Sequence, residues 1–331
     1  MNLNSRRVTA ILFFVTAALC SGAVLSAQSS PQIKHSRSDE DINAIGHRGV
    51  GQGVNLYSLE KEKKLGEALA KEVEHSSKLL DDPAVTDYVN RLAQKIAQNS
   101  DARLPITVRV INSDMIDAFT LPGGFLYVNT GLLLQTEGEA EVAGVLARGI
   151  AHTALRSFTK ETTKGELMQL ATIPMIIAGP ATWAGYGSFE GANLSIPLTS
   201  LKHRRDAEFA ADYFGLQYLY KSGYDLESYI RFLDRTWPQT PAGKKTLPKV
   251  FSPYPPLPER METMKKEIAK ILPPRDGAIV SSSEFQEVKE RVRAWKLKRT
   301  VSPETNPGKP TLRKLMAHPS SDPPTLTPDC E

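Results

Sequence analysis

The sequence predicts an α+β fold that is mainly helical and contains one small β-sheet. Apolar residues recur at helical spacing through residues 56–98. Residues 105–112 and 119–128 are rich in the β-branched and aromatic residues typical of strands. An apolar helix is expected over residues 137–152 and a short amphipathic helix over 259–270. This order places a small sheet beside the helix of residues 137–152.

Composition supports one main globular domain with appendages. The chain has 331 residues, of which 40% are hydrophobic and 24% charged, enough to bury a sizeable core. Its formal net charge is only +4, and no motif interleaves basic and aromatic residues, so a nucleic-acid partner is not expected. Only Cys20 and Cys330 are present, and Cys20 lies in the N-terminal apolar run.

The N-terminus has the pattern of a signal peptide over residues 1–27. A basic start is followed by the apolar run Val8–Leu25, and Leu25-Ser26-Ala27 fits a signal-peptidase site. The run is also long enough for an uncleaved anchor, which stays open as an alternative. Cleavage would leave Cys330 alone, so no intramolecular disulfide is expected. Residues 28–55 then form a polar N-terminal segment.

The helix of residues 137–152 contains half of a zinc-protease motif. In H-E-x-x-H, histidines at i and i+4 share one helix face and bind zinc, and the glutamate removes a proton from the zinc-bound water. Here His152 is correctly spaced, but Arg148 and Gly149 replace the first histidine and the glutamate. A guanidinium has no lone pair to offer a metal, and glycine has no side chain.

Two flanking motifs give this incomplete pattern a context. Residues 117–134 read DAFTLPGGFLYVNTGLLL, and residues 204–215 read RRDAEFAADYFG with Glu208 and Asp212 one helical turn apart. In this order, the three motifs resemble the M48 family of zinc metallopeptidases over about residues 40–275. The resemblance implies a zincin-like metallopeptidase domain, here 56–275, with the sheet next to the active-site helix.

The resemblance also implies a role for each matching residue. His152 takes the position of the second zinc histidine, Glu208 that of the third ligand, and Asp212 that of an acid that orients a ligating histidine. An edge strand that aligns extended substrates by β-addition is implied for Gly123, Gly124, Phe125, Leu126 and Tyr127.

Three departures from the family pattern imply that zinc binding is weak or absent. Arg148 stands at the first ligand position, Gly149 at the base, and Tyr254 where periplasmic relatives can place a histidine against the metal. Without zinc, the carboxylates of Glu208 and Asp212 would need another positive charge, so we expect Arg148 to pair with one of them.

Two functional readings follow. One is a catalytically impaired M48 metalloendopeptidase-like protein, a pseudoprotease of the bacterial cell envelope. It would bind extended polypeptide clients or regulate an active relative in protein quality control. The alternative is an active zinc metalloendopeptidase with a non-standard ligand set, using Glu139 or Glu141 as base, or His203 or His318 as an added ligand. Structural alternatives also exist: His152 could be a core histidine, and the two acids could form a solvated helix face.

The remaining segments are appendages. Residues 167–184 are apolar but interrupted by proline and glycine, which favours a lid or membrane-leaning hairpin over a membrane span. Residues 276–299 form a basic helical extension that is either a solvated face or a contact for anionic lipid or an acidic partner. Residues 300–331 are expected to be disordered. The protein is expected to be exported, and periplasmic or membrane-associated; the sequence does not indicate its oligomeric state.

Overall fold

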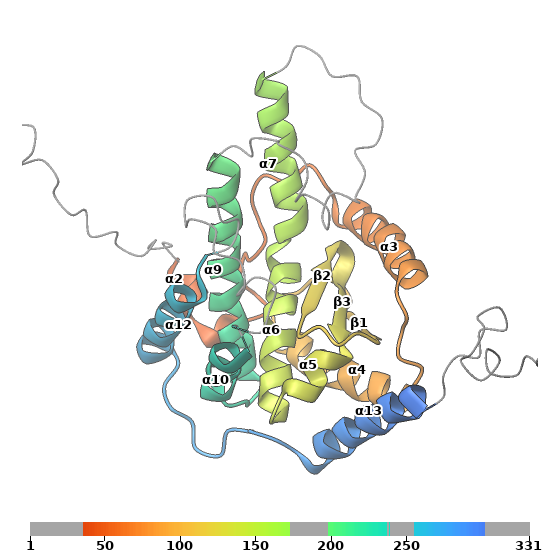
Figure 1. The fold of residues 1–331 in the computed structure, drawn as a ribbon. Helices are drawn as coiled ribbons and strands as arrows, with labels where there is room; N and C mark the ends of the chain where they lie inside the picture. The colour runs from red at the N-terminus through yellow and green to blue at the C-terminus, as the bar shows by residue number, and fades with distance from the viewer. Residues whose placement is uncertain (1–35, 173–197, 237, 239–254, 302–331) are drawn as a thin grey trace, which may run out of the picture.

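The computed structural model describes residues 36–172, 198–236, 238 and 255–301, and Figure 1 shows their arrangement. The mainly helical α+β prediction is confirmed. The α-helices are α2 (Arg37–Glu40), α3 (Leu59–Ser76), α4 (Pro83–Gln98), α5 (Thr130–Gln135), α6 (Glu139–Leu155), α7 (Ser157–Thr172), α9 (Leu198–Lys221), α10 (Leu226–Thr236), α12 (Leu257–Ile271) and α13 (Ser283–Val301). The strands are β1 (Thr107–Ile111), β2 (Ala118–Leu121) and β3 (Phe125–Asn129), and the short 3-10 helices are η1 (Ile42–Ala44) and η2 (Pro122–Gly124).

The three strands form one sheet in the order β1-β3-β2. Strand β3 pairs in parallel with β1 and antiparallel with β2, so it lies in the centre of the sheet. The expectation that Phe125, Leu126 and Tyr127 form an edge strand is therefore wrong. Both hydrogen-bonding sides of β3 are already used, and β2 is an edge of the sheet in the described part of the chain.

The hairpin between β2 and β3 depends on the Pro-Gly-Gly turn. Gly123 and Gly124 have φ angles of 82° and 89°, a region that side chains disfavour. A Cβ on Gly66 of α3 would come within 2.0 Å of the Pro122 carbonyl oxygen, so α3 packs directly on this turn. The turn thus fixes both the end of the sheet and its contact with α3.

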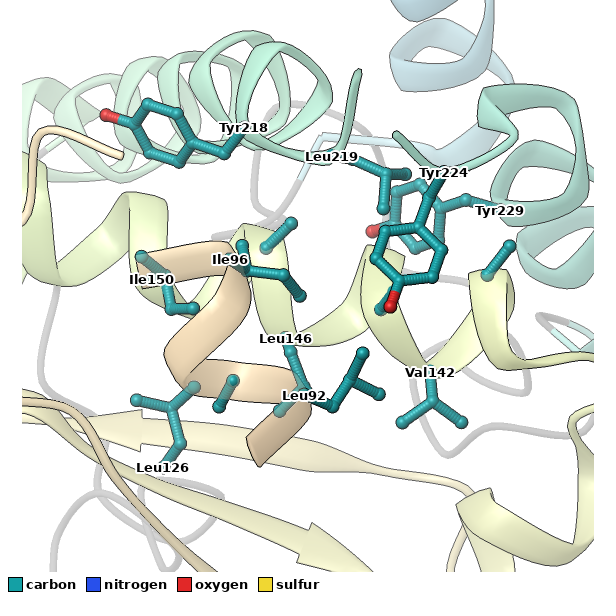
Figure 2. Close-up of a cluster of buried hydrophobic side chains, with 14 of the residues drawn as sticks. Leu92, Ile96, Leu126, Val142, Leu146, Ile150, Tyr218, Leu219, Tyr224 and Tyr229 are labelled. Carbon is teal, nitrogen blue, oxygen red and sulfur yellow. The ribbon is translucent and has the colours of Figure 1, made fainter. Parts of the chain in front are cut away.

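Helix α6 forms the centre of the fold, with the sheet on one side and α9 on the other (Figure 1). Apolar side chains of α4, α6 and the sheet meet tyrosines from α9 and α10 in the core (Figure 2). Glycines let the helices approach closely. A Cβ on Gly144 would lie 2.3 Å from the ring of Tyr229, and one on Gly215 would lie 3.1 Å from the Arg148 Cα. Helix α9 therefore lies tightly against the part of α6 that carries Arg148.

Part of the polar N-terminal segment expected for residues 28–55 packs on the core, within the described residues 36–55. Ile45 and Val50 are buried, and Arg48 is 4% exposed. The Arg48 Nη2 atom lies 2.5 Å from Asp101 Oδ2, and its Nη1 donates to Gln217 Oε1 at 2.5 Å. These contacts attach the segment to Asp101, shortly after α4, and to α9, and they provide the partners that a buried guanidinium needs.

Helix α13 contains the basic residues expected in the C-terminal extension, and several of them are paired within the chain. Arg291 contacts Asp82 at 3.1 Å, Lys296 contacts Asp114, and Lys289 donates to the Thr136 carbonyl. These pairs reduce the charge that this face could offer to a lipid or an acidic partner. Across the described residues, no helix is long and apolar enough to cross a bilayer.

Several predictions fall outside the described residues. They concern the signal peptide (1–27), most of the expected lid (173–184), Tyr254, and the tail from residue 302.

Candidate functional site

Two helices bring the predicted site residues together. Arg148 and His152 lie one turn apart on α6, and Glu208 and Asp212 lie one turn apart on α9. The Arg148 guanidinium forms an ion pair with the Glu208 carboxylate through Nη2 and Oε2, which confirms the expected pairing. Its Nε lies 3.3 Å from Asp212 Oδ1, a charge contact that lacks hydrogen-bond geometry. Arg148 thus bridges the two acids.

Arg260 of α12 completes this charged cluster. Its Nε donates to Asp212 Oδ2 at 2.7 Å and its Nη2 to Oδ1 at 2.6 Å, a bidentate pair. Asp212 is 3% exposed and Arg260 is 7% exposed. Asp212 was expected to orient a ligating histidine, but the structure joins both of its oxygens to Arg260. Arg260 could not be predicted from the sequence, since no spacing rule relates α12 to α9.

His152 faces the cluster rather than the apolar core. Its Nε2 lies 3.8 Å from Glu208 Oε1, and its Nδ1 lies 3.2 Å from the Ser157 hydroxyl. Ser157 is the first residue of α7 and follows Arg156, whose φ of 56° ends α6. The junction between α6 and α7 therefore sets the orientation of the imidazole.

The charges of the cluster reinforce one another. Burial alone would raise the pKa of Glu208, but Arg148, with His152 and Arg260, outweighs it and holds that pKa at about 2. Burial, followed by the nearby Arg148 charge, lowers the pKa of His152 to about 4. Burial disfavours the charge on Arg148, but Glu208 more than compensates and raises the pKa of the guanidinium. At neutral pH, Glu208 and Arg148 are charged and His152 is neutral.

Gly149, at the position of the catalytic base, faces the sheet. A Cβ there would lie 2.8 Å from Leu126 Cδ2 and 2.9 Å from Thr120 Oγ1. Both distances are below normal contact, so a Cβ at this position would require the Leu126 and Thr120 side chains to shift. The base position therefore lacks a functional group, and a side chain there would have to displace the ends of Leu126 and Thr120.

The edge of β2 runs beside this part of α6. The Asn129 amide donates to the Asp117 carbonyl at 3.1 Å, and the register pairs Ala118 with Val128. Because bonded and non-bonded pairs alternate in an antiparallel ladder, Ala118 and Thr120 direct their amides away from β3. The Ala118 amide donates to the Asp117 carboxylate at 2.8 Å. Thr120, whose hydroxyl lies close to Gly149, thus presents a backbone donor and acceptor on the outer edge of β2.

The acids proposed as alternative bases have other roles. Glu139 accepts hydrogen bonds from Tyr88 at 3.0 Å and Tyr224 at 2.7 Å, and Glu141 accepts one from Arg235 at 2.7 Å. Both acids lie in the first turn of α6, about 10–13 Å along the helix from the Arg148 position. His203 belongs to α9, but its side chain is outside the description, as is all of His318.

The donor set formed by the described residues does not fit zinc. His152 and Glu208 supply two donors, whereas a zinc site in a peptidase uses three protein ligands and one water. The first ligand position carries the Arg148 guanidinium, which repels a cation and already forms an ion pair with Glu208. Among the described side chains, no group of three His, Cys, Asp or Glu could hold a metal ion.

The helix motif, the sheet beside it and the acidic residues of α9 define a metallopeptidase-type domain. The profile of Peptidase family M48, a family of zinc metallopeptidases, matches residues 82–268, and the chain belongs to this family. The match lies within the expected domain of residues 56–275.

Three relatives carry the name beta-barrel assembly-enhancing protease, one of them as a putative protease. The putative protease of Vibrio cholerae is 27% identical over 232 residues, covering 68% of this chain and 47% of the relative. The protein of Yersinia pestis is 28% identical over 252 residues, covering 74% and 50%. That of Escherichia coli is 24% identical over 260 residues, covering 76% and 52%. The chain therefore spans about half the length of these relatives.

Proposed function

We propose that this chain is a catalytically impaired M48 protein of the cell envelope. It binds extended polypeptide clients, or regulates an active relative, in protein quality control. The observation that carries the proposal is the ion pair of Arg148 with Glu208 at the position where the family binds its metal. Loss of a general base alone costs about 10²–10⁴-fold in rate, and Gly149 provides no base.

The edge of β2 supports the binding half of the proposal. An extended peptide can add to a free sheet edge through main-chain hydrogen bonds, and Thr120 offers one outward donor and one outward acceptor. The relatives named for β-barrel assembly suggest clients that are rich in strands before they fold. Such clients suit a site that binds the polypeptide backbone through hydrogen bonds.

The N-terminal pattern supports an envelope location. Residues 1–27 read as a signal peptide, so the mature protein would be periplasmic or membrane-associated. A location outside the cytoplasm agrees with a role near unfolded envelope proteins.

Substitution of Thr120 by proline tests the client site. Proline removes the outward amide of Thr120 and leaves the β2–β3 ladder intact, since that amide is not in the ladder. The matched control is Thr120→Val, which keeps the amide and the branched shape. The probe is fluorescein-labelled, reduced and carboxymethylated α-lactalbumin, an unfolded polypeptide, and its binding is followed by fluorescence anisotropy. Thr120→Pro should weaken binding by about tenfold, the loss of one backbone hydrogen bond, and Thr120→Val should not.

Two results would reject the proposal. If Thr120→Pro keeps the wild-type circular dichroism spectrum and the wild-type affinity, β2 is not the client edge. If the purified wild-type protein cleaves the labelled probe, and a chelator stops the cleavage, the chemistry is not impaired.

A further inference from the structure

We infer that the Arg148 guanidinium is a built-in cation that takes the place of the metal ion, so that this domain folds and keeps its buried carboxylates charged without zinc. The inference shares one premise with the proposed function, namely that Arg148 has replaced a ligand. It does not depend on client binding. It concerns a charge-compensating site formed by Arg148, Glu208, Asp212, Arg260 and His152.

The balance of charges in the cluster supports this role of Arg148. Two guanidinium groups, Arg148 and Arg260, face two carboxylates, Glu208 and Asp212. Arg260 already satisfies both oxygens of Asp212. Glu208 forms its ion pair with Arg148, and the nearest nitrogen of its other neighbour, His152, lies 3.8 Å away. Removal of Arg148 would therefore leave the charge of Glu208 uncompensated.

Burial makes this loss costly. Glu208 is 9% exposed, and the side chain of Arg148 is 25% exposed. A buried carboxylate without a partner must take a proton, bind a cation or destabilise the fold. In the family, the metal ion would supply the positive charge at this place. In this chain, the side chain on α6 supplies it and links α6 to α9.

The geometry also predicts what could replace Arg148. The 3.8 Å between His152 Nε2 and Glu208 Oε1 allows both atoms to bind one ion at the usual distances of about 2 Å. Truncation at Cβ would open space beside these two donors. A variant without the guanidinium should therefore regain stability from an added cation, either a free guanidinium ion or zinc.

Thermal unfolding of Arg148→Ala tests the inference. Relative to wild type, its melting temperature should fall by about 10 °C, as expected for a broken buried ion pair in a domain of this size. Guanidinium chloride at about 10 mM, too dilute to denature, should recover part of this loss, as should zinc chloride. Wild-type protein should respond neither to zinc nor to a chelator. Arg148→Lys, which keeps a charge, should lose less than Arg148→Ala.

A second variant separates charge compensation from packing. In Arg148→Ala/Glu208→Gln the uncompensated charge is absent, so this protein should melt above Arg148→Ala and gain nothing from guanidinium. The inference is overturned if Arg148→Ala is as stable as wild type, or if both variants melt alike without rescue by any cation. It is also overturned if zinc stabilises the wild-type protein. Should Arg148→Ala fail to fold, Arg148→Lys and the double variant still provide the comparison.

Discussion

Substitution of Gly149 by alanine tests whether the catalytic-base position is closed by packing. Two effects of opposite sign compete. Alanine in place of glycine inside a helix favours folding by about 1 kcal/mol. The new Cβ would lie 2.8 Å from Leu126 Cδ2 and 2.9 Å from Thr120 Oγ1, and such overpacking costs about 1–3 kcal/mol. The packing term should win, so Gly149→Ala should be neutral or destabilising by up to about 2 kcal/mol.

A double-mutant cycle with Leu126→Ala isolates the packing term. Leu126→Ala removes one of the two side chains that the new Cβ would meet, so Gly149→Ala should be less destabilising in that background than in wild type, by about 1 kcal/mol. The measurement is urea unfolding followed by circular dichroism, with the four proteins compared at one pH. If Gly149→Ala stabilises the wild-type background as much as the Leu126→Ala background, the base position is not closed and the packing argument fails.

Two further predictions concern buried charges. The pKa of His152 is about 4 instead of 6.5 and that of Glu208 about 2 instead of 4.5, so stability should be lost as the pH falls from 6.5 to 2. Burial raises the pKa of Glu161 to about 7, so this residue makes the protein more stable, not less, as the pH falls from 7 to 4.5. The contribution of His152 is therefore taken as the difference in unfolding free energy between wild type and His152→Gln. That difference should be about 2–3 kcal/mol smaller at pH 4 than at pH 7, and no change with pH would contradict it. Arg48→Met should destabilise the protein by about 3–5 kcal/mol, because Asp101 loses its buried partner. Urea unfolding would measure this loss, and proteolysis near residue 50 would show whether the segment detaches. A loss below about 1 kcal/mol would contradict a stabilising role of the ion pair.

The charged site could be predicted in part because several of its residues are close in sequence. Histidine and arginine four residues apart share one face of α6, as do the two acids of α9, and buried acids require a positive charge. These rules predicted that Arg148 pairs with Glu208 or Asp212, and the structure contains the ion pair with Glu208. Arg260 was missed because its contact with Asp212 spans 48 residues, and no periodicity relates positions so far apart.

The strand order of the sheet could not be predicted from the sequence. The strand-forming residues at 105–112 and 119–128 could be recognised, but the second run forms two strands, β2 and β3, because the Pro-Gly-Gly turn divides it. Strand order was not readable, because the hairpin of β2 and β3 is compatible with either strand at the edge. The parallel pairing of β1 with β3 decides it, and that contact joins distant segments. Similarly, the burial of Ile45 and Val50 could not be predicted from the polar composition before α3, because it accompanies the ion pair of Arg48 with the distant Asp101.

The metal content of the purified protein is the most direct test of the claim that Arg148 stands in for the ion. Elemental mass spectrometry would count zinc per chain in wild-type protein purified without added metal or chelator, alongside a circular dichroism spectrum that shows the protein is folded. A folded protein with far less than one zinc per chain is the expected result, since two donors beside a guanidinium should not retain the ion. One zinc per folded chain would contradict it and would require a ligand set that includes residues beyond His152 and Glu208.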